Sequence, residues 1–136
     1  MSDEEALLHN AREWGVWKQL TLLMEGTEEL TDWTGRIGKN ADYITYSERR
    51  SKRRMVKYGR GGADRPLDAD VSHINNQFGS IFGVDQDEVY RRLKHYLPHA
   101  CMGYETRGCD YVAIRDVEDA EKFLEFLKSF LQKEEA

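Results

Sequence analysis

The sequence predicts a single α+β domain, and three observations support this prediction. Apolar residues recur at intervals of three and four near both ends of the chain, a pattern typical of amphipathic helices. Two segments rich in β-branched and aromatic residues flank a basic stretch, which indicates a β-hairpin. The 136 residues also suit one domain in size, so residues 1–136 are expected to form one folded unit.

The first 38 residues are expected to form two helices. The first is predicted over 3–24, where leucines and tryptophans share one face and Ser2 or Asp3 is the expected N-cap. The second is predicted over 27–37. Three tryptophans in this region imply extensive apolar burial, either inside the fold or in a homodimer interface.

A basic hairpin is predicted within residues 41–60. Its strands are expected at 43–46 and 55–58, with 49–54 as the connection. The glycine-rich segment 59–66 then breaks regular structure. This segment is too short to separate two full domains.

Two helices in close succession are predicted next. One begins at about residue 69 and ends at Gly83. The other begins at Asp85, with Glu88 three residues later as in a capping box, and ends before Pro98.

The chain is then expected to form a second hairpin and a final helix. The hairpin strands are predicted at 101–106 and 109–115, with the turn at Arg107. Asp116 is the expected cap of a helix over 116–133, which has a continuous apolar face.

The segment 77–93 resembles the helix-turn-helix of winged-helix DNA-binding proteins. Gly79 is the small residue that lets the second helix approach, and Gly83 is the turn glycine. Apolar residues follow the spacing that closes the angle between the helices: Phe78, Phe82, Val84, Val89 and Leu93. The resemblance covers about residues 71–115. It implies a winged helix-turn-helix core over 69–115, with extra N-terminal helices, the basic hairpin and a C-terminal helix.

The resemblance implies that residues 85–97 form a recognition helix for duplex DNA. Arg107 lies at the tip of the wing, and the outward polar residues of the helix are Gln86, Tyr90, Arg91, Lys94 and His95. Arginine and glutamine can read base edges, whereas lysine and tyrosine suit phosphates. Three carboxylates at the start of this helix (Asp85, Asp87 and Glu88) repel phosphates, and they favour the alternative of a protein-docking module.

Positive charge is concentrated in residues 49–65, which carry a net +7 and leave −12 for the rest of the chain. A second nucleic-acid contact with steep salt dependence is expected from Arg49, Arg50, Lys52, Arg53, Arg54, Lys57 and Arg60. The alternative is a solvated hairpin whose charges pair with the acidic helices. Tyrosines 43, 46 and 58 interleave with the charges, which suits single-stranded nucleic acid, but strand packing is the preferred interpretation.

Evidence for metal binding or catalysis is weak. Metal-capable side chains gather in the second half of the chain: His95, His99, Cys101 and Cys109. Their spacing fits neither a zinc finger nor a zinc ribbon, so the cysteines are interpreted as reduced, small apolar residues on the wing strands. Glu105 and Asp110 lack a third acid in register for a nuclease site. No cofactor, metal site or catalytic residue is predicted.

These patterns predict a small winged-helix nucleic-acid-binding protein, acting as a DNA-binding regulator or accessory factor. A homodimer through the N- or C-terminal helices is expected. The alternatives are a protein-interaction module with the same fold and, less favoured, a small metal-dependent nucleic-acid enzyme. No apolar run is long enough to span a bilayer, and the acidic N-terminus does not resemble a signal peptide, so a cytoplasmic location without a membrane partner is expected.

Overall fold

Five antiparallel strands form one sheet in the computed structural model, which describes residues 2–61, 65–72, 77–101 and 110–131. The strands lie in sequence order: β1 (Thr34–Ile37), β2 (Tyr43–Ser47), β3 (Arg54–Gly59), β4 (Asp68–Ser72) and β5 (Asp110–Ala113). The described helices are α1 (Asp3–Glu13), α2 (Trp17–Leu30), α3 (Gln77–Phe82), α4 (Gln86–Tyr96) and α6 (Val117–Leu131). The predicted α+β class is confirmed.

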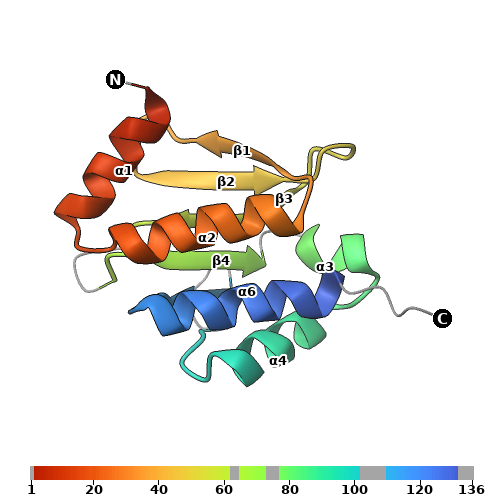
Figure 1. Cartoon of the computed structure of the whole chain (residues 1–136). Helices are drawn as coiled ribbons and strands as arrows, with labels where there is room; N and C mark the ends of the chain where they lie inside the picture. The colour runs from red at the N-terminus through yellow and green to blue at the C-terminus, as the bar shows by residue number, and fades with distance from the viewer. Residues whose placement is uncertain (1, 62–64, 73–76, 102–109, 132–136) are drawn as a thin grey trace.

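Helices α2 and α6 lie side by side across one face of the sheet (Figure 1). A Cβ atom at Gly26 of α2 would overlap the side chain of Leu124 of α6, so this glycine permits their close packing. The strands bury Ile44, Tyr46, Tyr58, Ala69 and Val112 within the core. The sheet therefore has a helix-covered face and an opposite face, called here the open face.

The prediction of one helix over 3–24 is wrong. Gly15 has a φ of +76°, and the chain turns there between α1 and α2. Glycine adopts this left-handed conformation without the steric cost that other residues have. The predicted Ser2 cap is confirmed, because its side chain accepts a hydrogen bond from the Glu5 N–H in a capping box.

The prediction of a helix over 27–37 is also wrong. Helix α2 ends at Leu30, and Thr34–Ile37 instead forms β1 at the edge of the sheet. Hydrogen bonding to β2 stabilises the extended conformation, and Gly35 leaves room there for the ring of Tyr46. Tertiary pairing thus overrides a weak local helical pattern.

The helix predicted from residue 69 is wrong at its start, and its described part is α3 (Gln77–Phe82). Residues 68–72 form β4, which pairs with both β3 and β5. Ala69 and Val71 are buried, and they alternate with Asp68 and Asp70 on the open face. This two-residue period is typical of a strand, and it is the signal that the helical interpretation overlooked.

The first predicted hairpin and the predicted helices that begin at Asp85 and Asp116 are confirmed where the structure describes them. Strands β2 and β3 form the expected hairpin. Asp85 caps α4 by accepting the Glu88 N–H at 2.9 Å, and Asp116 caps α6 by accepting the Asp119 N–H at 2.8 Å. The backbone of Cys101 forms an isolated antiparallel β-bridge with Tyr111 of β5. Residues 102–109 of the predicted wing, including Arg107, lie outside the described residues. No helix among the described residues is long and apolar enough to span a membrane.

Candidate nucleic-acid interface

The β2–β3 connection is a tight turn with four exposed cations. The Glu48 N–H donates to the Arg53 carbonyl at 2.8 Å, and the Lys52 N–H donates to the Glu48 carbonyl at 2.9 Å. The Ser51 hydroxyl accepts the Arg53 N–H at 3.2 Å. Backbone, Glu48 and Ser51 groups therefore shape the turn, whereas the exposed side chains belong to Arg49, Arg50, Lys52 and Arg53. These four residues are called the turn cations below.

The turn cations have no carboxylate partner within the described part of the chain. None of the ion pairs found there includes any of the four. No pairing of these four cations with the acidic helices is found among the described residues. Four neighbouring like charges outnumber the one carboxylate of the turn, Glu48, and create a positive surface that attracts anions.

A row of polar side chains crosses the open face next to this turn. The register aligns Arg36 of β1 with Thr45 of β2, and Thr45 with Lys57 of β3. Tyr43 and Ser47 lie two residues on either side of Thr45, so they project from the same face. The Lys57 ammonium lies 4.5 Å from the centre of the Tyr43 ring, a favourable cation–π distance.

The β1–β2 edge of this face contains a hollow of about 620 Å³. The side chains lining it that bear on binding are Arg36, Lys39, Tyr43, Thr45 and Ser47. Arg36 and Lys39 are exposed, and sequence reasoning missed both of them. Neither lies in a charge run, so only the folded structure places them beside Tyr43, in the hollow that all three line.

The charge of the side chains on the open face changes from positive to negative at β4. Asp68 and Asp70 project from it, and Arg65 covers part of this region, with Nε 3.6 Å from Asp68 Oδ2 and its guanidinium 4.4 Å from the Tyr111 ring centre. Burial raises the pKa of Asp70, although Lys57, Arg54 and Arg65 act in the opposite direction. An anionic ligand is therefore favoured on the β1–β3 half and disfavoured near β4.

The remaining cations predicted in the hairpin are more dispersed. Arg54 and Lys57 are half-buried on β3. Arg60 lies beyond the far end of β3, about 20 Å from Arg54 at the usual rise of a strand. Its guanidinium is 5.7 Å from the centre of the Trp14 ring. Arg60 therefore does not extend the turn.

The predicted recognition helix carries cations with local partners. Arg91 Nε donates to Glu88 Oε1 at 2.8 Å, and Arg92 Nε donates to Glu88 Oε2 at 2.6 Å. Hydrogen bonds from both arginines lower the pKa of Glu88 to about 2. Lys94 Nζ donates to the Tyr90 hydroxyl at 3.1 Å. Because Arg91 and Lys94 have these partners and Gln86 is uncharged, α4 offers less free positive charge than the turn.

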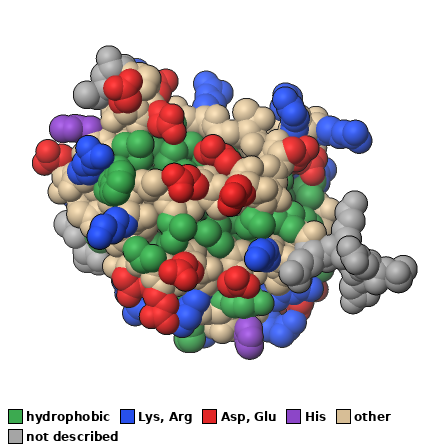
Figure 2. All heavy atoms as spheres, in the orientation of Figure 1, with side chains coloured by type: hydrophobic (Ala, Val, Ile, Leu, Met, Phe, Trp, Pro, Cys, Tyr) green, Lys and Arg blue, Asp and Glu red, His purple; other side chains and the backbone are tan. Residues whose placement is uncertain are grey.

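The two predicted contact regions lie apart. Figure 1 places the β2–β3 turn at the upper right and α4 along the lower edge of the molecule. Figure 2 shows basic side chains projecting at the upper right and many carboxylates over the face formed by α2 and α6. The cations predicted on the hairpin and those predicted on α4 therefore do not form one continuous patch.

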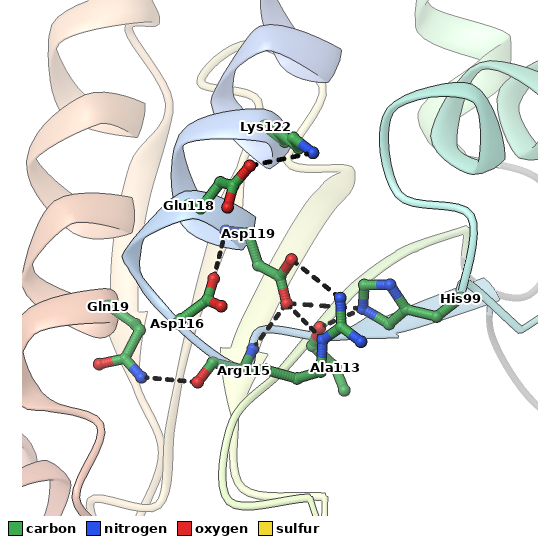
Figure 3. Close-up of polar contacts among 8 residues, drawn as sticks. All are labelled: Gln19, His99, Ala113, Arg115, Asp116, Glu118, Asp119 and Lys122. Atoms are coloured by element: carbon green, nitrogen blue, oxygen red, sulfur yellow. Dashed lines mark hydrogen bonds and ion pairs between the residues drawn. The ribbon is translucent and has the colours of Figure 1, made fainter.

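A separate polar cluster joins β5 to the start of α6 (Figure 3). Asp119 Oδ2 accepts hydrogen bonds from the backbone N–H of Arg115 at 2.9 Å and from its Nε at 2.8 Å. His99 Nε2 lies 2.7 Å from the Ala113 carbonyl oxygen and 3.7 Å from Asp119 Oδ2. Burial acts to raise the pKa of Asp119, but the Arg115 hydrogen bonds outweigh it and hold that pKa below its usual value. This arrangement fastens the β5–α6 junction.

Replacing Asp119 by alanine is expected to lower the free energy of unfolding by about 2 kcal/mol at neutral pH, because charge-assisted hydrogen bonds are lost. A carboxylate with a depressed folded-state pKa stabilises the fold above its unfolded pKa, near 3.9, and this contribution disappears as the pH falls through the folded value. The difference between wild type and Asp119→Ala should therefore shrink in acid. Urea unfolding at neutral and acidic pH measures it. The exposed Glu118→Ala is the control, and a difference independent of pH would contradict this assignment.

Metal-capable side chains do not converge in the described structure. Among the described residues, no group of three or more His, Cys, Asp or Glu side chains is placed to hold a metal ion. Of the four residues considered for zinc, Cys109 lies outside the described residues.

No protein-family model, curated protein or solved structure matches this chain, so similarity assigns it no function. The charge and geometry of the turn and of the open face are the observations that bear on function.

Proposed function

We propose that this protein binds nucleic acid and that the turn cations are its main contact with the phosphate backbone. One observation carries the proposal: four adjacent exposed cations lack an ionic partner among the described residues. A nucleic-acid strand presents a dense row of phosphates, and each phosphate neutralised by lysine or arginine releases condensed counterions. Cations that form no ion pair with a carboxylate are best suited to this exchange.

The overall charge restricts how such a ligand can approach. The chain has a net charge of −5, and acidic side chains are numerous on the face formed by α2 and α6 (Figure 2). A polyanion is repelled from that face and attracted to the turn. The proposed complex therefore has one orientation, with the β2–β3 turn towards the nucleic acid and the α2–α6 face away from it.

A winged helix-turn-helix remains part of the proposal as a second contact. It is supported by the φ of +73° at Gly83 between α3 and α4, by the pairing of β4 with β5, and by the bridge between Cys101 and Tyr111. In this proposal Gln86, Tyr90, Arg91, Lys94 and Arg107 meet duplex DNA, and the protein acts as a DNA-binding regulator or accessory factor. The pairing of Arg91 with Glu88 makes this contact secondary.

The sharpest test compares Arg53→Ala with Arg91→Ala, two exposed arginines that differ in their partners. Loss of one phosphate contact at 0.1 M salt should weaken binding about fivefold for Arg53→Ala and by less than about twofold for Arg91→Ala. Fluorescence anisotropy with labelled single-stranded and duplex oligonucleotides measures both. An equal or larger loss for Arg91→Ala would assign the main contact to α4, and no binding by the wild type would contradict the proposal.

A protein-interaction module is the second candidate, and one feature favours it. A groove of about 270 Å³ between α2 and α6 is lined by Leu30 and Leu124, and the charged residues around it are three glutamates and one lysine: Glu29, Glu121, Glu125 and Lys128. Such a surface suits a basic, partly apolar segment of another protein. A stable protein complex recovered from a sample that shows no oligonucleotide binding would favour this function.

A further inference from the structure

We infer that the nucleic acid held by the turn cations is single-stranded and that one unpaired nucleotide occupies the hollow at the β1–β2 edge of the open face. This inference rests on the proposed function and specifies its substrate class. It is carried by the composition of the hollow, by its position beside the turn and by the side of the sheet on which it lies.

The hollow combines the groups that a nucleotide requires. Tyr43 supplies an aromatic ring, Arg36 and Lys39 supply exposed cations, and Thr45 and Ser47 supply hydroxyl groups. Aromatic rings pack against bases of any sequence, and cations pair with the flanking phosphates. A volume of about 620 Å³ also falls within the range of small-ligand sites.

The hollow and the turn form one continuous path. Ser47 lines the hollow and directly precedes Glu48, where the turn begins. From Ser47 to Tyr43 the strand covers about 13 Å at the usual rise per residue. A strand whose backbone pairs with the turn cations can therefore run along β2 and place a base beside Tyr43.

Tyr43 lies on the open face of the sheet, whereas the other two hairpin tyrosines lie on the helix-covered face. Tyr46 and Tyr58 are fully buried, and their hydroxyls lie 2.6 Å from Glu28 Oε2 and 2.7 Å from Thr27 Oγ1. Those two rings belong to the core between the sheet and the helices. Tyr43 is only half-buried and lines the hollow. Lys57 and Gly38 also contact its ring, so a base can reach the exposed part of the ring that faces the hollow.

A duplex does not suit this surface. Paired bases present only their edges, at the bottom of the grooves, whereas a ring on a sheet packs against the face of a base. That contact requires a base released from pairing. Asp70, one strand beyond Lys57, repels phosphates and keeps the path on the β1–β3 half of the face.

Binding of a single strand, a duplex of the same sequence and the mononucleotides AMP and UMP is compared for the wild type and four variants. Tyr43→Leu removes the ring but keeps apolar bulk, and Arg36→Gln removes an exposed charge without disturbing the core. Tyr96→Leu, a half-buried tyrosine on α4, and Lys18→Gln, an exposed lysine on α2, are their matched controls. Thermal unfolding verifies the fold of each variant.

The single strand is expected to bind at least about tenfold more tightly than the duplex, and Tyr43→Leu to weaken single-strand binding about tenfold with little change for the duplex. Arg36→Gln should weaken single-strand binding about fivefold, which keeps the test decisive if Tyr43→Leu does not fold. Equal binding of both forms, with no effect of Arg36→Gln, would overturn this inference but not the proposed function. Mononucleotide binding as tight as that of the strand would also overturn it. No binding of any probe would overturn both.

Discussion

Replacing Phe78 by alanine is expected to lower the free energy of unfolding by about 3 to 5 kcal/mol, the range typical of a buried phenylalanine. Phe78 is completely buried. Its ring lies 5.1 to 6.4 Å from four other aromatic ring centres, those of Trp33, Phe82, Phe126 and Phe130. Loss of this ring leaves a cavity and removes the contacts that hold α3 against α6.

Urea unfolding followed by tryptophan fluorescence measures this effect, because Trp33 belongs to the same cluster. Val117→Ala is the control: Val117 is 36% exposed, and its truncation should change stability by less than about 0.5 kcal/mol. The loss of unfolding free energy for Phe78→Leu should lie between the losses for Phe78→Ala and Val117→Ala. A loss below about 1 kcal/mol for Phe78→Ala would show that α3 is not anchored by this cluster.

Replacing all four turn cations by glutamine is expected to weaken nucleic-acid binding about 100- to 1,000-fold at 0.1 M salt, because four phosphate contacts are lost together. The fold should be retained, since the four side chains are exposed and the turn is held by backbone, Glu48 and Ser51 groups. Thermal unfolding compares the stabilities, and anisotropy titration measures the affinity.

The matched control removes the same amount of charge from the helices. It replaces four exposed cations of α1, α2 and α6 by glutamine: Arg12, Lys18, Lys122 and Lys128. Both variants therefore have the same net charge. Equal weakening in the two would mean that overall charge, rather than the turn, governs binding.

The elements predicted correctly have local signals. The side chains of Asp85 and Asp116 each accept a hydrogen bond from the N–H group three residues later. Such short-range capping patterns identify where α4 and α6 begin. The hairpin of β2 and β3 combines β-branched and aromatic residues with a short polar connection. These features are readable without knowledge of distant partners.

The elements predicted wrongly depend on distant partners. Strand β1 is stabilised by β2, and β4 lies between β3 and β5. A helical spacing of a few apolar residues cannot reveal such pairing. The break at Gly15 was likewise hidden, because a glycine within an amphipathic pattern does not by itself indicate a turn.

The candidate interface could be predicted from the sequence only in part, for the same reason. The turn cations are adjacent in sequence, so their concentration is visible before folding. Arg36 and Tyr43 come from different strands and meet only through the register of β1 with β2. The pairing of Glu88 with Arg91 and Arg92 could have been foreseen, since spacings of three and four place these side chains together on a helix.

The most direct test of the central claim is the salt dependence of single-strand binding. The logarithm of the association constant is measured against the logarithm of salt concentration for the wild type, the variant lacking the turn cations and the helix control. We expect the slope of the turn variant to be shallower than that of the wild type by about 3, and the control to match the wild type. Equal slopes for the wild type and the turn variant would contradict the claim that the β2–β3 turn binds the phosphate backbone.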